Sequence, residues 1–410
     1  MASYKSQSRP YRGHDRGQGR GGQHPLPSLE NKKRILSGLE KQAVKTWYIY
    51  DVIGDFSTTP SPGQKVDITN RRAIASYNWH DSKIVVPGAP KEFFAWTGGR
   101  LTKFNEITSS DVDQDHAPTM PLEPIITAVR VCQPNFEFRD YDIVADIYVL
   151  DGLIRFALAC VEECRARSDA PLADKEKHVW RIDVQVIGNT LLMVRKVLEP
   201  TYPAAGCGMA YRRACTKPPP NSMLRGGQLD EELVTGHFTM ITSITIGRVK
   251  MLLGHEAVAQ YPPDQSIPVS GPGEVPACSG VECTIAGYKG DLNSLTLISL
   301  CSRKMNAYLN PAKWMYQYII GSQHRYVGRH DRGVFAENSL FMEPLIRTRE
   351  LAGLDQLSTD LWLQTFEKIL AEIVAFAREY RSGIDDGNKG FHSGVVCRTD
   401  KEVYARLAAA

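Results

Sequence analysis

The chain has 410 residues, of which 42% are hydrophobic and 23% are charged, and its formal net charge is +3. This composition is typical of a soluble globular protein. No run of about 18 apolar residues occurs, which excludes a membrane-spanning helix on length grounds. The N-terminus is polar and basic and has no short apolar core, which excludes a secretory signal peptide. We therefore expect an intracellular protein, nuclear or cytoplasmic, with no membrane partner.

The nine cysteines include no CxxC pair. Their odd number and irregular spacing indicate reduced thiols that mostly fill the core. A structural zinc site needs paired Cys or Cys/His knuckles, so the sequence disfavours one. It gives no support to a redox function.

The first 34 residues carry most of the charge asymmetry. They hold eight basic and two acidic residues, so their net charge of +6 leaves −3 for the rest of the chain. The stretch 12–22 reads RGHDRGQGRGG, and such a segment cannot bury enough apolar surface to offset its ordering entropy. We expect residues 1–34 to be a disordered tail. Arg separated by Gly is also typical of segments that hold single-stranded nucleic acid. The alternatives are a solvated tail without a ligand, and a tail that contacts RNA through Arg9, Arg12, Arg16 and Arg20.

The predicted elements begin with a first strand or docking segment over residues 41–51. A short strand pair follows, formed by ASYNW (75–79) and IVVPGAP (84–90), and it ends at Pro87 and Gly88. We then expect a helix, a strand and a second helix, over residues 121–131, 141–148 and 150–165.

The clearest hairpin lies between residues 180 and 194. Ile182, Val184 and Val186 alternate with polar residues before Gly188-Asn189, which supplies a type II′ turn ahead of the second strand, 190–194. The same alternation predicts one long strand over 240–253 that leads to His255 and Glu256. The remaining elements are two strands at 295–300 and 326–327, and an amphipathic helix marked by Leu363, Phe366, Leu370, Ile373 and Ala377.

These elements predict an α+β fold, a single body with mixed, mostly antiparallel β-sheets flanked by helices. We place this domain at residues 35–382. An irregular Pro-rich insertion interrupts it over about residues 261–280. Residues 383–410 are then a C-terminal extension.

Generic catalytic motifs are missing from the sequence. It contains no GxxxxGK[ST] phosphate loop, no GxSxG elbow and no HExxH zinc motif. GCGMAY at 206–211 lacks the third glycine of a dinucleotide-binding loop. His324 and His330 lie in a basic stretch without a carboxylate at ligand spacing, so we interpret them as solvated surface histidines.

Several short strings occur in an order that resembles a known family. SYNW at 76–79 is followed by IVVPGAP and then by five further strings: PLEPIITAV, FEFRDYDIVAD, WRIDVQVIGNTLLMVRK, IGRVKMLLGHEA and HDRGVF. In this order they resemble a divergent fungal branch of the DXO/Rai-type decapping nuclease and exoribonuclease family, over residues 74–377. The resemblance implies a DXO/Rai-like fold, RNA as a partner and, for the Rai type, a nuclear 5′→3′ exoribonuclease as a second partner.

The reaction of that family requires a particular set of charged side chains at the active site. Cleavage of a cap or phosphodiester with two Mg²⁺ or Mn²⁺ ions requires several carboxylates that converge on one spot. A strand with Glu-x-Asp presents both acids on one face, because side chains alternate with period two. Glu-x-Lys on a neighbouring strand does the same. An Arg and a further Glu complete the set that the resemblance implies.

Most of this set is substituted here. The family's Arg falls on Ile147, and the Glu of its Gly-x-Φ-Φ-Glu motif falls on Arg212. Glu-x-Asp falls on Glu256 and Val258, so that only Glu256 is retained. The Glu and the Lys of the last motif fall on Ile298 and Leu300. Glu282 could instead substitute from the insertion.

The substitutions lead to three hypotheses for the function of the protein, of which we favour the first. It is a catalytically degenerate pseudoenzyme that binds RNA or a protein partner and holds no metal. The second is a residually active, metal-dependent decapping hydrolase. The third is an unrelated α+β interaction protein with an RNA-binding tail. Under the first hypothesis, Arg212 replaces the metal ion as the group that neutralises Glu256. We then expect an ion pair between Arg212 and Glu256 in the cleft.

The tail itself generates a prediction. Deleting residues 1–22 should flatten the slope of log K against log salt for single-stranded RNA, because each phosphate contact releases about 0.7 counterions. Fluorescence polarisation of a labelled oligonucleotide across a salt series measures this slope. An unchanged slope would mean that the tail is only a solvated appendage.

Overall fold

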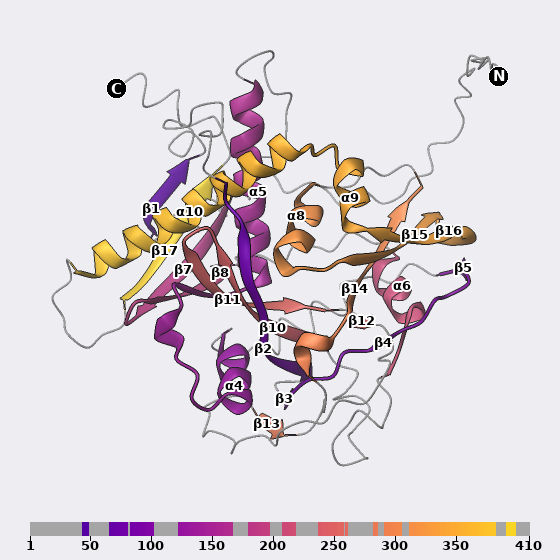
Figure 1. The fold of residues 1–410 in the computed structure, drawn as a ribbon, viewed down its shortest axis with the longest axis horizontal. Coiled ribbons are helices and arrows are strands. Elements are labelled where there is room, and N and C mark those ends of the chain that lie inside the picture. The colour runs from indigo at the N-terminus through magenta and orange to yellow at the C-terminus, as the bar shows by residue number, and fades with distance from the viewer. Residues whose placement is uncertain are drawn as a thin grey trace, which may run out of the picture.

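The computed structural model describes residues 43–48, 65–80, 83–101, 122–166, 179–196, 207–218, 237–257, 259–260, 282–285, 291–305, 311–382 and 391–398. They form two curled mixed sheets flanked by helices (Figure 1). The α+β fold class predicted from the sequence is confirmed. None of the described helices has the length and apolar character that a membrane span needs.

The larger sheet has ten strands in the order β1-β17-β7-β8-β6-β11-β10-β2-β3-β13. Five of its nine pairs are antiparallel, whereas β6 runs parallel to both β8 and β11, and the outer pairs β1–β17 and β3–β13 are also parallel. Its strands are β1 (Ala43–Tyr48), β2 (Ile68–His80), β3 (Lys83–Val86), β6 (Ile143–Asp146), β7 (Val179–Ile187), β8 (Thr190–Lys196), β10 (His237–Ile246), β11 (Val249–Glu256), β13 (Glu282–Ile285) and β17 (Phe391–Arg398).

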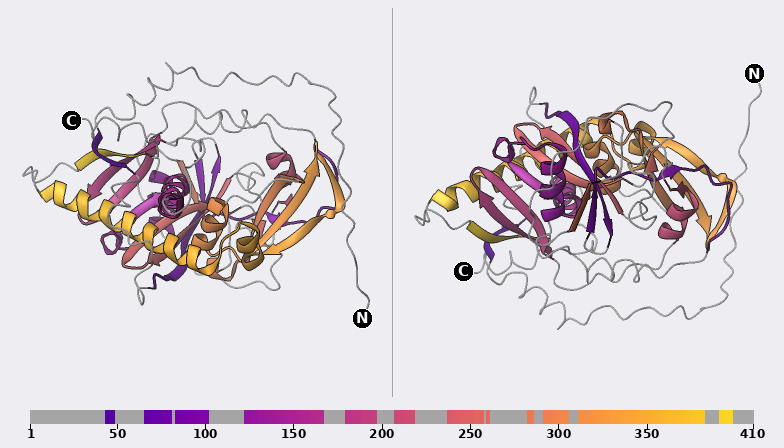
Figure 2. Two further views of the ribbon diagram at one scale, coloured as in Figure 1. Left: turned by 90° about the horizontal axis from the view of Figure 1, so that it is seen from above. Right: turned by 90° about the horizontal axis from the view of Figure 1, so that it is seen from below.

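The smaller sheet has seven strands in the order β5-β16-β15-β14-β12-β4-β9. It lies at the end of the molecule opposite β1 and β17 (Figures 1 and 2). Its strands are β4 (Glu92–Phe93), β5 (Gly99–Arg100), β9 (Thr216–Lys217), β12 (Ala259–Gln260), β14 (Leu297–Lys304), β15 (His324–Asp331) and β16 (Val334–Pro344).

Helices cover both faces of the larger sheet. Three of them, α5, α8 and α10, pack on one face, and α4 packs on the other. The long helix α10 runs along its face in both views of Figure 2. The helices are α4 (Glu123–Cys132), α5 (Ile147–Ala166), α6 (Gly208–Ala214), α8 (Pro311–Ile320), α9 (Leu345–Leu351) and α10 (Gln356–Ser382), and two 3-10 turns, η1 (Phe138–Asp140) and η3 (Leu292–Ser294), complete the described elements.

Two predicted strands differ from the observed ones. The segment 240–253 is a hairpin of β10 and β11, because Gly247 adopts φ 56° and reverses the chain. Ile246 pairs with Val249 across this turn, so the apolar alternation continues through it and hides it in the sequence. The predicted strand 141–148 ends at Asp146, whose Oδ1 accepts a hydrogen bond from the Val149 amide and thereby caps α5.

The string SYNW holds the following loop against β2. The Ser76 hydroxyl donates to the Gly88 carbonyl at 3.1 Å, and the Gly88 amide donates to the Ser76 carbonyl at 3.0 Å. Asn78 donates through Nδ2 to the Ala89 carbonyl at 3.1 Å, and its Oδ1 accepts from the Ala89 amide at 2.6 Å. Gly88 is required here, because a Cβ would lie 2.4 Å from the Tyr77 backbone. The string is therefore a structural lock.

This lock generates a stability prediction. Asn78 is 1% exposed, so Asn78→Ala leaves a buried N–H and a buried C=O of Ala89 unpaired and should lower the free energy of unfolding by about 2 to 4 kcal/mol. A urea titration at pH 7 measures this loss. The exposed Asn338 provides the control, and Asn338→Ala should stay within about 0.5 kcal/mol of the parent. Equal effects of the two substitutions would show that the lock contributes nothing to stability.

Candidate functional site

Glu256 ends β11 at the point where the chain passes from the larger sheet to the smaller one. Arg212 donates from Nη1 to its Oε1 at 2.7 Å, and the Nδ1 atom of His237 lies 3.8 Å from the same oxygen. The side chains of Arg212 and Glu256 are 34% and 35% exposed. The expected ion pair is therefore present, at a partly solvated position.

The surroundings of Glu256 determine its protonation state. Burial disfavours the carboxylate, but the charge of Arg212 and the contact with His237 outweigh burial and lower the pKa of Glu256 to about 2. The carboxylate is consequently ionised at neutral pH. The guanidinium of Arg212 neutralises it.

The short helix α6 positions Arg212. The neighbouring Tyr211 is fully buried and stacks on Phe335 and Tyr326, with ring centroids 5.3 and 6.3 Å apart. This aromatic anchor fixes the helix against β14–β16, while Arg212 extends to Glu256. Burial raises the pKa of the Tyr211 phenol far above its ordinary value.

Two predicted site positions lie inside that aromatic cluster. Ile298 and Leu300 alternate on β14, are 1% and 5% exposed, and pack with Tyr211, Tyr326 and Phe335. Ser299 between them has the opposite orientation on the strand and accepts a hydrogen bond from Gln317 of α8 at 2.8 Å. The two positions thus contribute apolar packing and no charge.

Of the remaining predicted residues, the structure describes only Ile147, and it does not bring Ile147 to Glu256. Ile147 begins α5 and packs, partly buried, against the core between α5, α8, α10 and the larger sheet. Val258 lies outside the described residues, as do Arg9, Arg12, Arg16 and Arg20.

Two further expectations from the sequence are corrected. Glu282 begins the edge strand β13, and β10, β2 and β3 separate that strand from β11, so it is not a substitute ligand. His330 is no surface residue: it is 8% exposed, and its Nδ1 accepts from the Gly333 amide at 3.2 Å. It is buried because β15 lies in the interior of the smaller sheet, where Phe335 packs against its ring.

The residues at this site do not fit the pair of divalent ions that the resemblance implies. Such ions need several converging carboxylates, and Arg212 already neutralises the carboxylate of Glu256. In the part of the chain that the structure describes, no three His, Cys, Asp or Glu side chains are grouped so as to hold a metal.

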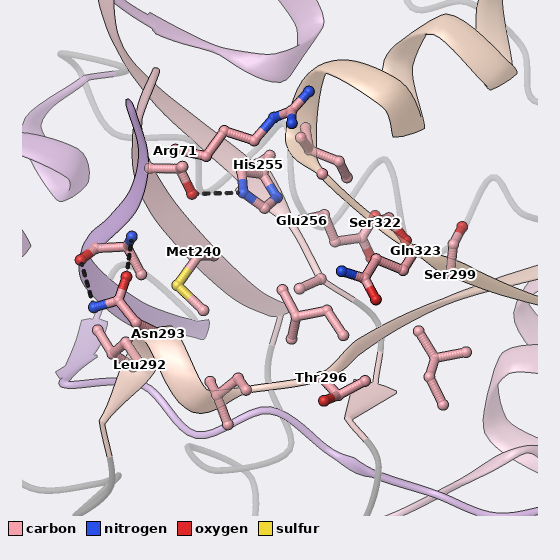
Figure 3. Close-up of a pocket in the computed structure, with 18 of the residues that line it drawn as sticks. Arg71, Met240, His255, Glu256, Leu292, Asn293, Thr296, Ser299, Ser322 and Gln323 are labelled. Carbon is pink, nitrogen blue, oxygen red and sulfur yellow. Dashed lines mark hydrogen bonds between the residues drawn. The ribbon is translucent and has the colours of Figure 1, made fainter. Parts of the chain in front are cut away.

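A cavity of about 450 Å³ adjoins the ion pair (Figure 3). It lies between β2, β10 and β11 of the larger sheet and η3, β14 and the end of α8. Glu256 lines it, whereas Arg212 is not among its lining residues. The amide of Gln323 points into it, and Arg71 extends along its border to donate to the Ile319 and Tyr318 carbonyls at the end of α8.

His255 is a buried member of this cavity that the sequence did not single out as a site residue. It is 1% exposed, its Nε2 lies 3.0 Å from the Thr242 hydroxyl, and its Nδ1 has no hydrogen-bond partner among the described residues. Burial lowers the pKa of His255 to about 4, so the ring is neutral at pH 7. The buried wall of the cavity around His255 and Thr242 is therefore polar and uncharged at neutral pH, while Arg71, Arg72 and Glu256 also line the cavity.

His237 is also missing from the predicted site. Its position follows from the β10–β11 register, in which Thr239 pairs with Glu256. The Gly247-Arg248 dipeptide is a turn signal in the sequence. A hairpin that turns at this dipeptide places His237 at the same end of the sheet as Glu256.

Comparison with known proteins identifies the fold. No family model matches the sequence, and no curated protein matches it. Rai1 of S. pombe in complex with 3′-FADP superimposes with a TM-score of 0.51 and 12% identity, over 85% of this chain and 97% of that one. Rai1 of Scheffersomyces stipitis in complex with (3′-NADP)+ and calcium ion gives a TM-score of 0.51 and 11% identity, over 86% and 95%. The chain therefore has the fold of Rai1, as the order of its sequence strings implied.

Proposed function

We propose that this chain is a catalytically degenerate relative of the Rai1-type decapping and exoribonuclease proteins, which binds RNA without cleaving it. The observation that carries the proposal is the ion pair between Arg212 and Glu256. A guanidinium lies at the carboxylate that would otherwise hold a metal ion.

The other substituted positions support the same conclusion. Ile298 and Leu300 are apolar and packed in one cluster with Tyr211, so these two positions of β14 bring no charged group to Glu256. Metal-assisted hydrolysis needs ligands for the ions and a stabiliser for the developing charge. Among the described residues at this site, Glu256 supplies one carboxylate as a ligand, and Arg212 neutralises it.

Two features favour RNA as the ligand. The fold is that of proteins crystallised with 3′-FADP and (3′-NADP)+, which are nucleotides. The basic, Arg/Gly-rich segment 1–34 has the composition of single-strand-binding tails. A protein partner docked on the same scaffold is the second form of the proposal.

The absence of catalysis is testable. Purified protein with Mg²⁺ or Mn²⁺ should release no product above background from 5′-triphosphate, unmethylated-cap or 5′-monophosphate RNA. High-resolution gel electrophoresis over several hours measures the products. Turnover that Glu256→Ala abolishes and the exposed control Glu337→Ala retains would contradict the proposal and favour a residual hydrolase. If no RNA binds in the same buffers, the chain is an interaction protein of another kind.

The ion pair gives a second test by a double-mutant cycle. Arg212→Ala and Glu256→Ala should each lower the midpoint of urea unfolding, because each leaves a partly buried charge without its partner, whereas the double variant should largely recover it. At one-third exposure, water compensates part of this cost, so we expect a coupling of about 1 to 2 kcal/mol and not the 3 to 5 of a fully buried pair. Arg155 and Asp151, 36% and 35% exposed, form the matched control, with a coupling of roughly 0.3 to 0.5 kcal/mol.

The same cycle should depend on pH with a defined sign. The pKa of Glu256 is lowered from 4.5 to about 2, so the pair stabilises the fold fully above pH 4.5 and loses this contribution as the pH falls towards 2. The coupling measured at pH 3 should therefore be smaller than at pH 7. Additive losses at pH 7 would show that the two groups do not interact in solution.

A further inference from the structure

The cavity beside Glu256 lies mainly on the other face of β11 from the ion pair. His255 and Glu256 are consecutive in this strand, so their side chains point to opposite faces of the sheet. Met240 is the cross-strand partner of His255, shares its face and also lines the cavity. Arg212 and His237, which contact the Glu256 carboxylate, are not among the lining residues. The cavity is therefore a separate site next to the ion pair.

Polar groups without a hydrogen-bond partner line this cavity from three segments of the chain. The first is Nδ1 of the buried His255. The backbone of Glu256 opposes the fall in the pKa of His255, but it makes no hydrogen bond of normal geometry with this atom. The others are the side-chain amide of Gln323 and the hydroxyl of Thr296, which form no hydrogen bond within the described ranges. Polar groups that converge in this way are available to a ligand.

The rest of the lining is largely apolar. Met240, Leu292, Leu295 and Leu297 line the cavity and belong to one hydrophobic cluster. In Figure 3, Met240 and Leu292 lie on one side of the cavity and Gln323 lies on the other. A methionine thioether also packs favourably against aromatic rings. The cavity therefore offers apolar contacts on one side and hydrogen bonds on the other.

The charges around the cavity favour an uncharged group inside it. The ring of His255 is neutral at pH 7, because burial lowers its pKa to about 4. Glu256 supplies the only carboxylate among the described lining residues, and Arg212 already neutralises it. At the border, Arg71 donates to two backbone carbonyls and makes no ion pair with a described carboxylate. A neutral group attached to an anionic chain fits this distribution better than a cation does.

We propose that this cavity binds one unpaired nucleobase. A nucleobase has two apolar faces and an edge of hydrogen-bond donors and acceptors, and proteins recognise unpaired bases through contacts of both kinds. His255, Gln323 and Thr296 supply the contacts for the edge, and the apolar wall packs against a face. The volume of about 450 Å³ lies in the range of small-molecule sites. The choice of a nucleobase rests on the proposed RNA-binding function, and the base belongs either to an RNA strand or to a free nucleoside.

Free nucleosides test the cavity directly. Ligand-observed NMR titrations of the full chain in EDTA compare adenosine, guanosine, cytidine and uridine with ribose, which lacks a base. We expect at least one nucleoside to bind with a dissociation constant on the order of 0.1 to 1 mM, and ribose not to bind. Failure of all four nucleosides to bind, or equal binding of ribose, would overturn the proposal.

Two substitutions locate the bound base. His255→Phe and Gln323→Leu each remove one hydrogen-bonding group and should weaken nucleoside binding about three- to tenfold. The matched controls are the buried His330 and the half-buried Gln185, which lie outside the cavity, so His330→Phe and Gln185→Leu should keep the affinity. Gln323 is exposed, so its variant decides the matter even if loss of the His255–Thr242 contact prevents folding of His255→Phe. Unchanged affinity of Gln323→Leu would place the base elsewhere and overturn the proposal.

A single-stranded RNA oligonucleotide identifies the source of the base. Its affinity for the full chain is measured by fluorescence polarisation, with and without a saturating concentration of the nucleoside that binds best. Competition shows that the base belongs to the RNA, and binding of both without competition shows that the cavity accepts free nucleosides; both results support the cavity. If RNA binds but no nucleoside does, the cavity proposal fails and the proposed function stands. If nucleosides bind but RNA does not, the proposed function fails and the cavity proposal stands.

Discussion

The carboxylate of Glu256 must be neutralised at a place where water reaches it only in part. The residues before it in β11 are largely buried, and Ala257, Ala259 and Gln260 after it are buried in the passage to the smaller sheet. A charge at such a junction is tolerated when an opposite charge or an ion lies against it. Here the opposite charge belongs to Arg212, so the position of α6, the junction of the sheets and the electrostatics of the site depend on one another.

The sequence predicts elements whose signal is local. Alternation and the Gly188-Asn189 turn correctly place β7 and β8, and the spacing of Leu363 to Ala377 correctly places α10. The β10–β11 hairpin is missed because its apolar alternation continues across the turn. The Arg212–Glu256 pair could be expected only through the family resemblance, because the two residues lie on elements that are distant in sequence.

The aromatic cluster around Tyr211 limits what a reversal of the substitutions could achieve. A carboxylate at Ile298 would lie in the apolar cluster of Tyr211, Tyr326 and Phe335, at a position that is 1% exposed. Its burial would favour the protonated form, which is a poor metal ligand. Reconstruction of an acidic centre would therefore require changes in the packing of α6 as well as new acids.

The lock formed by Ser76, Asn78, Gly88 and Ala89 has a separate consequence. The four hydrogen bonds described above join β2 to the loop after β3, and none of these four involves Glu256 or Arg212. The fold requires these four residues in an active enzyme and in a protein that only binds its ligand. A signature built from them identifies the ancestry of the scaffold and carries no information about turnover.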